Sequence, residues 1–282
     1  MSGYFAAVPI RQLPTEDGHL TYREAGSGPP LVFLHGGYLD HRLWEEQFRH
    51  FAPTHRVIAF DARGHGTSSN ATRPYRLVDD LAAVLRALDA APAVLVGLSM
   101  GGGTAVDCAL EYPELVRALV VSGVGTSEPA FEHPWSLGVF ADLQKAMAAA
   151  DADGIAEVLL RFATGPEREP SEVDPATIAL VRTMTLDTIA KHTPDEPDHR
   201  VPVTDTWRRA ARLTLPLLAL NGAVDGPDNH AMATRLAAAV PGGRTVDIPN
   251  AAHYPNLEDP ARFNTELAAF LDRSASDRSP RP

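Results

Sequence analysis

A serine between two glycines, in the segment Gly97-Leu98-Ser99-Met100-Gly101, most constrains what this chain can fold into. Four apolar residues that suit a buried strand, 93–96, precede the segment, and a helical pattern over 104–110 follows it. A strand that turns sharply into a helix places the serine hydroxyl at the tip of a sheet, beside the helix N-terminus. Side chains in place of the glycines would crowd such a turn. The segment therefore predicts a nucleophile elbow with Ser99 as the nucleophile.

The chain has 282 residues and a formal net charge of −11. Its length suits one large α/β domain with an insertion. Because nucleic acids and anionic membranes attract basic surfaces, the acidic balance argues against both as partners. No stretch approaches the roughly 20 apolar residues of a membrane span, and the first residues lack a signal-peptide pattern. We therefore expect a cytoplasmic protein whose partner is a small-molecule substrate.

The single cysteine, Cys108, lies among apolar residues, which predicts a buried and inert thiol. One cysteine cannot form an intrachain disulfide. The spacing of cysteine and histidine residues is not that of a zinc site, so the sequence implies no metal and no cofactor.

Short apolar runs alternate with helical patterns through the first 121 residues. Runs that are apolar throughout are typical of parallel strands buried on both faces. The alternation predicts an α/β fold with a doubly wound, mostly parallel sheet. Strands are expected at 20–24, 31–34, 57–60, 93–96 and 116–121, with helices at 41–51 and 75–90.

The pattern changes after residue 124, where buried strands stop. Helical stretches such as 141–150 and 154–162 are separated there by charged, proline-rich segments. Strands resume at 215–220 and 244–248, before a closing helix over 259–271. We therefore predict that 1–124 and 214–272 form the core, that 125–213 form a helical cap, and that 273–282 form a disordered tail.

A serine becomes a strong nucleophile only when a base takes its proton and a third group orients that base. Two candidates follow late strands: Asp225 comes after 215–220, and His253 comes after 244–248. The carboxyl ends of parallel strands meet at the edge where ligands bind, so these side chains are expected near Ser99. Asp228 is an alternative acid in the same loop.

These motifs, in this order, resemble those of cap-bearing α/β-hydrolases. The resemblance runs from about residue 20 to 271 and implies the α/β-hydrolase fold, with a cap inserted after the sixth strand. It implies Ser99 as nucleophile, His253 as general base and acid, and Asp225 as its orienting partner. The resemblance rests on Leu34-His35-Gly36-Gly37, Asp61-Ala62-Arg63-Gly64-His65-Gly66-Thr67-Ser68, Gly97–Gly102, Asn221–Asp225 and Ala252–Glu258.

The same resemblance implies an oxyanion hole made by two backbone N–H groups, those of Met100 and Gly37, with Tyr38 as the neighbouring alternative to Gly37. His35 is expected to anchor the loop that carries Gly37, and Asp61 to tie down the turn that follows it. Substrate contacts are expected from the loop, from the cap and beside the base, namely from Tyr38, Trp135, Phe140 and Tyr254.

The cap shows no basic cluster for a phosphate or a polycarboxylate, so an uncharged or weakly polar ester or lactone is the expected substrate. Hydrolysis would proceed through an acyl-enzyme on Ser99. The same triad also fits C–C bond hydrolase, amidase or perhydrolase chemistry. From a different class, a small-molecule receptor with a slow or vestigial triad also fits the fold.

Overall fold

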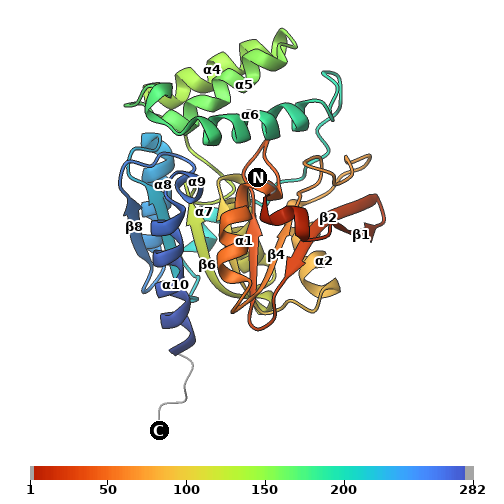
Figure 1. The fold of residues 1–282 in the computed structure, drawn as a ribbon, viewed down its shortest axis with the longest axis vertical. Helices are drawn as coiled ribbons and strands as arrows, with labels where there is room; N and C mark the ends of the chain where they lie inside the picture. The colour runs from red at the N-terminus through yellow and green to blue at the C-terminus, as the bar shows by residue number, and fades with distance from the viewer. Residues whose placement is uncertain (1–2, 277–282) are drawn as a thin grey trace.

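One sheet of eight strands forms the centre of the protein in the computed structural model, which describes residues 3–276 (Figure 1). The strands lie in the order β1-β2-β4-β3-β5-β6-β7-β8, and the six from β3 to β8 pair in parallel. The prediction of a mostly parallel α/β sheet is confirmed. The strands are β1 (Arg11–Thr15), β2 (Gly18–Ala25), β3 (Pro30–Leu34), β4 (Arg56–Phe60), β5 (Ala93–Leu98), β6 (Val116–Ser122), β7 (Leu217–Gly222) and β8 (Arg244–Ile248).

Helices cover both faces of the sheet because its central strands are apolar on both. All six residues of β5 are buried, and its side chains alternate between two cores: Leu95 belongs to one, Val94 and Val96 to the other. The first core is closed by α2 (Leu77–Ala87), α3 (Met100–Glu111) and α8 (Pro227–Ala239), and the second by α1 (Glu45–Phe51), α9 (Pro255–Glu258) and α10 (Pro260–Ser276).

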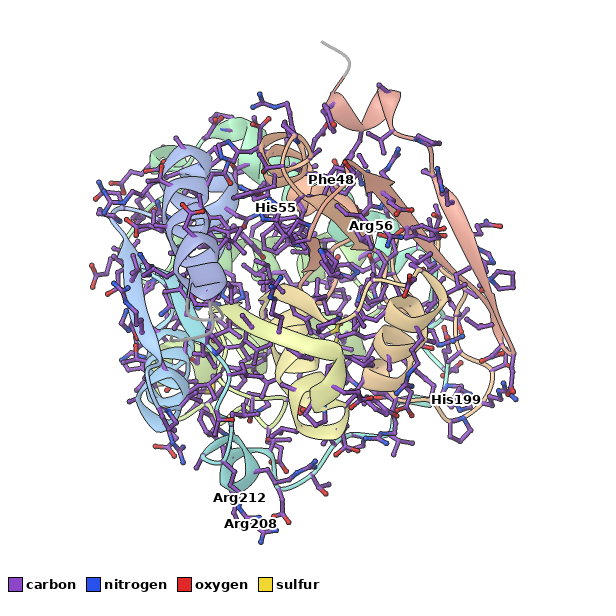
Figure 2. The ribbon with its side chains drawn as sticks, turned by 90° about the horizontal axis from the view of Figure 1, so that it is seen from below. Phe48, His55, Arg56, His199, Arg208 and Arg212 are labelled. Atoms are coloured by element: carbon purple, nitrogen blue, oxygen red, sulfur yellow. The ribbon has the colours of Figure 1, made fainter. Side chains whose placement is uncertain are left out.

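The segment between β6 and β7 is helical, as expected for the cap. Figure 1 shows α4 (Pro134–Ala148), α5 (Ala152–Thr164) and α6 (Pro175–Ile189) together on one end of the core. The short α7 (Thr206–Ala210) instead contacts α3 and α8, and its Ala210 is buried in the core. Figure 2 shows that Arg208, in α7, and Arg212, just after it, point away from the sheet.

Several boundaries differ from the sequence prediction. The strand β1 was not predicted, because its residues alternate between exposed and half-buried positions and supply no apolar run. The predicted helix at 41–51 begins as a 3-10 turn, His41–Trp44, and becomes α1 only at Glu45. The closing helix α10 continues to Ser276, past the expected end of the core at 272, and residues 277–282 lie outside the described part. None of the helices in 3–276 is long and apolar enough to cross a membrane.

The carboxyl group of Asp107 is buried in α3, on the helix that begins at the elbow. The Ser127 hydroxyl, at the start of the cap segment, donates a 2.7 Å hydrogen bond to it. Burial outweighs that bond and raises the pKa of Asp107 to about 7. Between its unfolded value near 3.8 and about 7, the folded protein thus holds a proton that the unfolded chain releases.

We therefore predict that Asp107 makes the free energy of unfolding fall as pH rises from 4 to 7. The loss amounts to at most about 4 kcal/mol, and Asp107→Asn should abolish it. Denaturant unfolding of wild type and variant across this range measures the effect, with the exposed Asp195→Asn as control. Parallel stability curves for wild type and Asp107→Asn would contradict the prediction.

Candidate active site

Ser99 lies in the sharp turn between β5 and α3, where the sequence predicts it. Its backbone is left-handed, with φ 50° and ψ −118°, a strained conformation for a residue with a side chain. A Cβ on Gly97 would lie 2.5 Å from the backbone of Gly101, and one on Gly101 would overlap the carbonyl oxygen of Leu34. The turn closes so tightly that both glycines are required.

The His253 ring is buried beside the carboxylate of Asp225. Its Nδ1 lies 2.9 Å from Asp225 Oδ2, and the other oxygen, Oδ1, accepts bonds from the Gly226 backbone N–H and the Asn229 amide. A carboxylate accepts, so Nδ1 carries the proton and Nε2 is left as the basic nitrogen. Asn229 was not predicted, although its place one helical turn after Asp225 is a usable signal.

The backbone brings the elbow and His253 into one neighbourhood. The N–H of Ser99 donates a 2.9 Å bond to the carbonyl of Ser122, at the end of β6. The next residue, Gly123, is so close to the imidazole that a Cβ there would lie 2.5 Å from His253 Cε1. The cap contributes as well, because the carbonyl of Phe162 in α5 accepts the backbone N–H of His253 at 3.2 Å.

The alternative acid, Asp228, has a different role. Its Oδ2 accepts the backbone N–H groups of Glu132 and His133, at 3.2 and 2.9 Å, just before α4 begins. It therefore ties the cap to α8, while the carboxylate that contacts His253 is that of Asp225.

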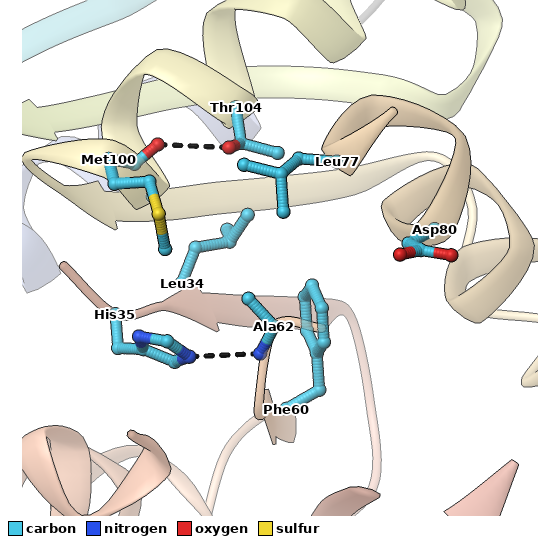
Figure 3. Close-up of a pocket in the computed structure, with 9 residues that line it drawn as sticks. Leu34, His35, Phe60, Ala62, Leu77, Asp80, Met100 and Thr104 are labelled. Atoms are coloured by element: carbon cyan, nitrogen blue, oxygen red, sulfur yellow. Dashed lines mark hydrogen bonds between the residues drawn. The ribbon is translucent and has the colours of Figure 1, made fainter. Parts of the chain in front are cut away.

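The loop that carries Gly37 is anchored as predicted by His35. Figure 3 shows the backbone N–H of Ala62 bonded to His35 Nε2, at 2.9 Å. His35 Nδ1 lies 2.7 Å from the Gly36 carbonyl, so this nitrogen carries the proton and donates. Burial lowers the pKa of His35 and keeps the ring neutral, as both bonds require. The Cβ direction of Gly37 is open, with no atom within 4 Å.

A cavity of about 640 Å³ separates the core from the cap and reaches both predicted oxyanion-hole residues, Gly37 and Met100. Its walls come from the core loops 63–75 and from cap segments around 147–155 and 188–200. Of the four predicted substrate contacts, Tyr38 lines this cavity.

The other three predicted contacts, Trp135, Phe140 and Tyr254, do not line this cavity. Trp135 and Phe140 pack on Phe162, which in turn stacks 5.2 Å from His253. The buried Tyr254 ring also contacts His253, edge to face, with 5.4 Å between the ring centroids. All three shape the surroundings of the base; a contact with substrate stays a prediction.

Asp40, His41 and Asp61 bring carboxylate and imidazole atoms within 4.8 Å of one another, close enough to suggest a metal site. These atoms are already engaged. His41 Nδ1 lies 2.8 Å from Asp61, its Nε2 accepts from Arg23, and Asp40 holds Arg42 through both oxygens. Asp61 also accepts the N–H of Thr67, at 3.0 Å, and ties down the turn as predicted.

A family model described as the alpha/beta hydrolase fold matches residues 29–260. This chain belongs to that family. The hydrolase is 29% identical over 265 residues to the putative non-heme bromoperoxidase BpoC of Mycobacterium tuberculosis, covering 90% of this chain and 97% of that one. It is 28% identical over 257 residues to a pimeloyl-[acyl-carrier protein] methyl ester esterase of Pectobacterium atrosepticum, covering 88% and 96%. Its fold matches a structure titled "Est816 as an N-Acyl homoserine lactone degrading enzyme", at 26% identity and TM-score 0.75, covering 92% and 100%.

The two acidic residues after β7 give a direct test of the site. We expect Asp225→Asn to lower kcat for p-nitrophenyl butyrate by about a thousandfold or more, because an amide no longer enforces the Nδ1–H tautomer of His253. Asp228→Asn should retain most activity, since its amide oxygen still accepts from the cap backbone. Steady-state kinetics of both purified variants measure this, and the reverse order of losses would contradict the assignment.

Proposed function

We propose that the protein is a serine hydrolase that cleaves a carboxylic ester or lactone of a small molecule through an acyl-enzyme. One observation carries the proposal: the strained, glycine-bounded turn at Ser99 is bonded to the end of β6, and the next residue, Gly123, packs against the buried His253–Asp225 pair. Two similar proteins, a methyl ester esterase and a lactone-degrading enzyme, support the same reaction class.

In this mechanism Ser99 Oγ attacks the substrate carbonyl carbon while His253 Nε2 takes the hydroxyl proton. The carbonyl oxygen becomes an oxyanion and accepts the N–H groups of Gly37 and Met100, each worth about 3 kcal/mol in the transition state. The C–O bond breaks, and His253 returns the proton to the departing alkoxide. Water then gives a proton to His253 and attacks the acyl carbon. The bond to Ser99 Oγ breaks, His253 returns the proton to Ser99, and the acid is released.

The single cysteine, Cys108, is poorly suited to this reaction. Burial raises the pKa of the Cys108 thiol to about 12, so the reactive thiolate is scarce at neutral pH. Acyl transfer is therefore assigned to Ser99.

Removing the nucleophile tests the proposal. We expect Ser99→Ala to lose at least about a thousandfold of the wild-type turnover of short-chain p-nitrophenyl esters. The exposed Ser27→Ala, in the turn after β2, is the matched control and should keep full activity. Unchanged hydrolysis by Ser99→Ala would overturn the serine mechanism. Tight binding of a small molecule without turnover of any ester or lactone would favour the receptor class.

A further inference from the structure

We propose that the cavity contains an anion subsite, formed by the Arg200 guanidinium and the hydroxyls of Tyr38 and Tyr75, that binds a free carboxylate on the substrate. The inference rests on the proposed function and narrows it: the substrate is an ester or lactone that carries a second, ionised acid group. One arginine with two phenols suits a single carboxylate, and this site was hidden from the sequence because no cluster of basic residues marks it.

The backbone holds Arg200 at the cavity wall. The N–H of Tyr75 donates to the carbonyl of His199 at 3.0 Å, and the N–H of Val201 donates to the carbonyl of Tyr75 at 2.8 Å. This parallel bridge joins the end of the cap segment to the loop before α2. Residues 125 positions apart are thereby fixed side by side, and both Tyr75 and Arg200 line the cavity.

Arg200 keeps hydrogen-bonding capacity that the neighbouring arginine has lost. Arg63 also lines the cavity, but its side chain is 4% exposed and binds both oxygens of Asp80, at 2.8 and 2.9 Å. The Arg200 side chain is 49% exposed, and its ion pair with Asp198 is long, at 3.8 Å. A guanidinium has five N–H donors, so Arg200 can bind an incoming carboxylate.

The two phenols supply further donors. Among the described residues, the Tyr38 hydroxyl contacts only the sulfur of Met147, at 4.0 Å. The Tyr75 ring lies against the Arg63 guanidinium, and its hydroxyl has no hydrogen bond within residues 3–276. Burial raises the pKa of both phenols, so both stay protonated at neutral pH. Both tyrosines line the same cavity as Arg200, and the backbone bridge fixes Tyr75 beside Arg200.

Two carboxylates also line the cavity and compete with an anionic ligand. Glu196 is engaged by His192 Nδ1, at 2.9 Å, and by the Asn70 amide. Asp198 is 72% exposed and is the group that already faces Arg200. Its negative charge should therefore weaken anion binding. Removing the Asp198 charge should strengthen binding of an anionic substrate, whereas removing the Arg200 charge should weaken it.

The kinetic test compares monomethyl succinate, glutarate and adipate with their dimethyl esters, by methanol release. For the best-fitting chain length, Arg200→Gln should lower the kcat/KM ratio of hemiester to diester about tenfold. We expect no larger effect because solvent screens an ion pair made by a half-exposed arginine. Arg200→Lys should retain part of the preference, and Asp198→Asn should raise the ratio. Arg208→Gln, which changes an exposed side chain of α7, should leave the ratio unchanged. Equal loss for both ester types in Arg200→Gln would overturn the proposal.

A binding test separates this inference from the proposed hydrolase function. Isothermal titration of Ser99→Ala with the same hemiesters and diesters should show tighter binding of a hemiester, lost when Arg200→Gln is added. That result without wild-type turnover would keep the subsite and reject the hydrolase. Ser99-dependent turnover without any preference for the hemiester, in rate or in binding, would keep the hydrolase and reject the subsite.

Discussion

The close approach of strand and helix backbones around Ser99 is the constraint on which the site depends. With glycine at 97 and 101, β5 and α3 meet tightly enough to hold Ser99 at a left-handed φ. A free chain would relax this strain, so the packed sheet must hold it in place. The buried apolar strand β5 provides that support, because its side chains anchor in the cores on both faces.

His35 and His253 are held in the same tautomer, with the proton on Nδ1. At His35 the Gly36 carbonyl fixes the proton on Nδ1, and at His253 the Asp225 carboxylate does so. In each ring Nε2 is then an acceptor. At His35 it accepts the Ala62 N–H, and at His253 it has no hydrogen-bond partner within residues 3–276, which leaves it for the serine proton in our proposed mechanism. One tautomer thus serves structure in the first case and, by our proposal, catalysis in the second.

The sequence predicts the core elements and the acid–base pair because each depends on a local signal. Buried parallel strands are apolar runs, and loops at their carboxyl ends meet at one edge, which is enough to place Asp225 and His253 together. Asp225 and Asp228 belong to one loop, and only the folded structure distinguishes the one that contacts His253 from the one that binds the cap backbone. The cavity was beyond reach because its wall depends on the pairing of Tyr75 with 199–201, which no periodicity encodes. Residue type alone predicts Trp135 and Phe140 as substrate contacts, whereas their positions depend on the packing of α4 on Phe162.

The most direct test of this account is acid quenching during turnover of p-nitrophenyl butyrate, followed by mass spectrometry of the protein and its peptides. The account predicts one butyryl group per chain, located on the peptide that contains Ser99. The group should be absent from samples that are quenched after the substrate is exhausted. Rapid turnover with no covalent adduct, or an adduct on another residue such as Cys108, would contradict it.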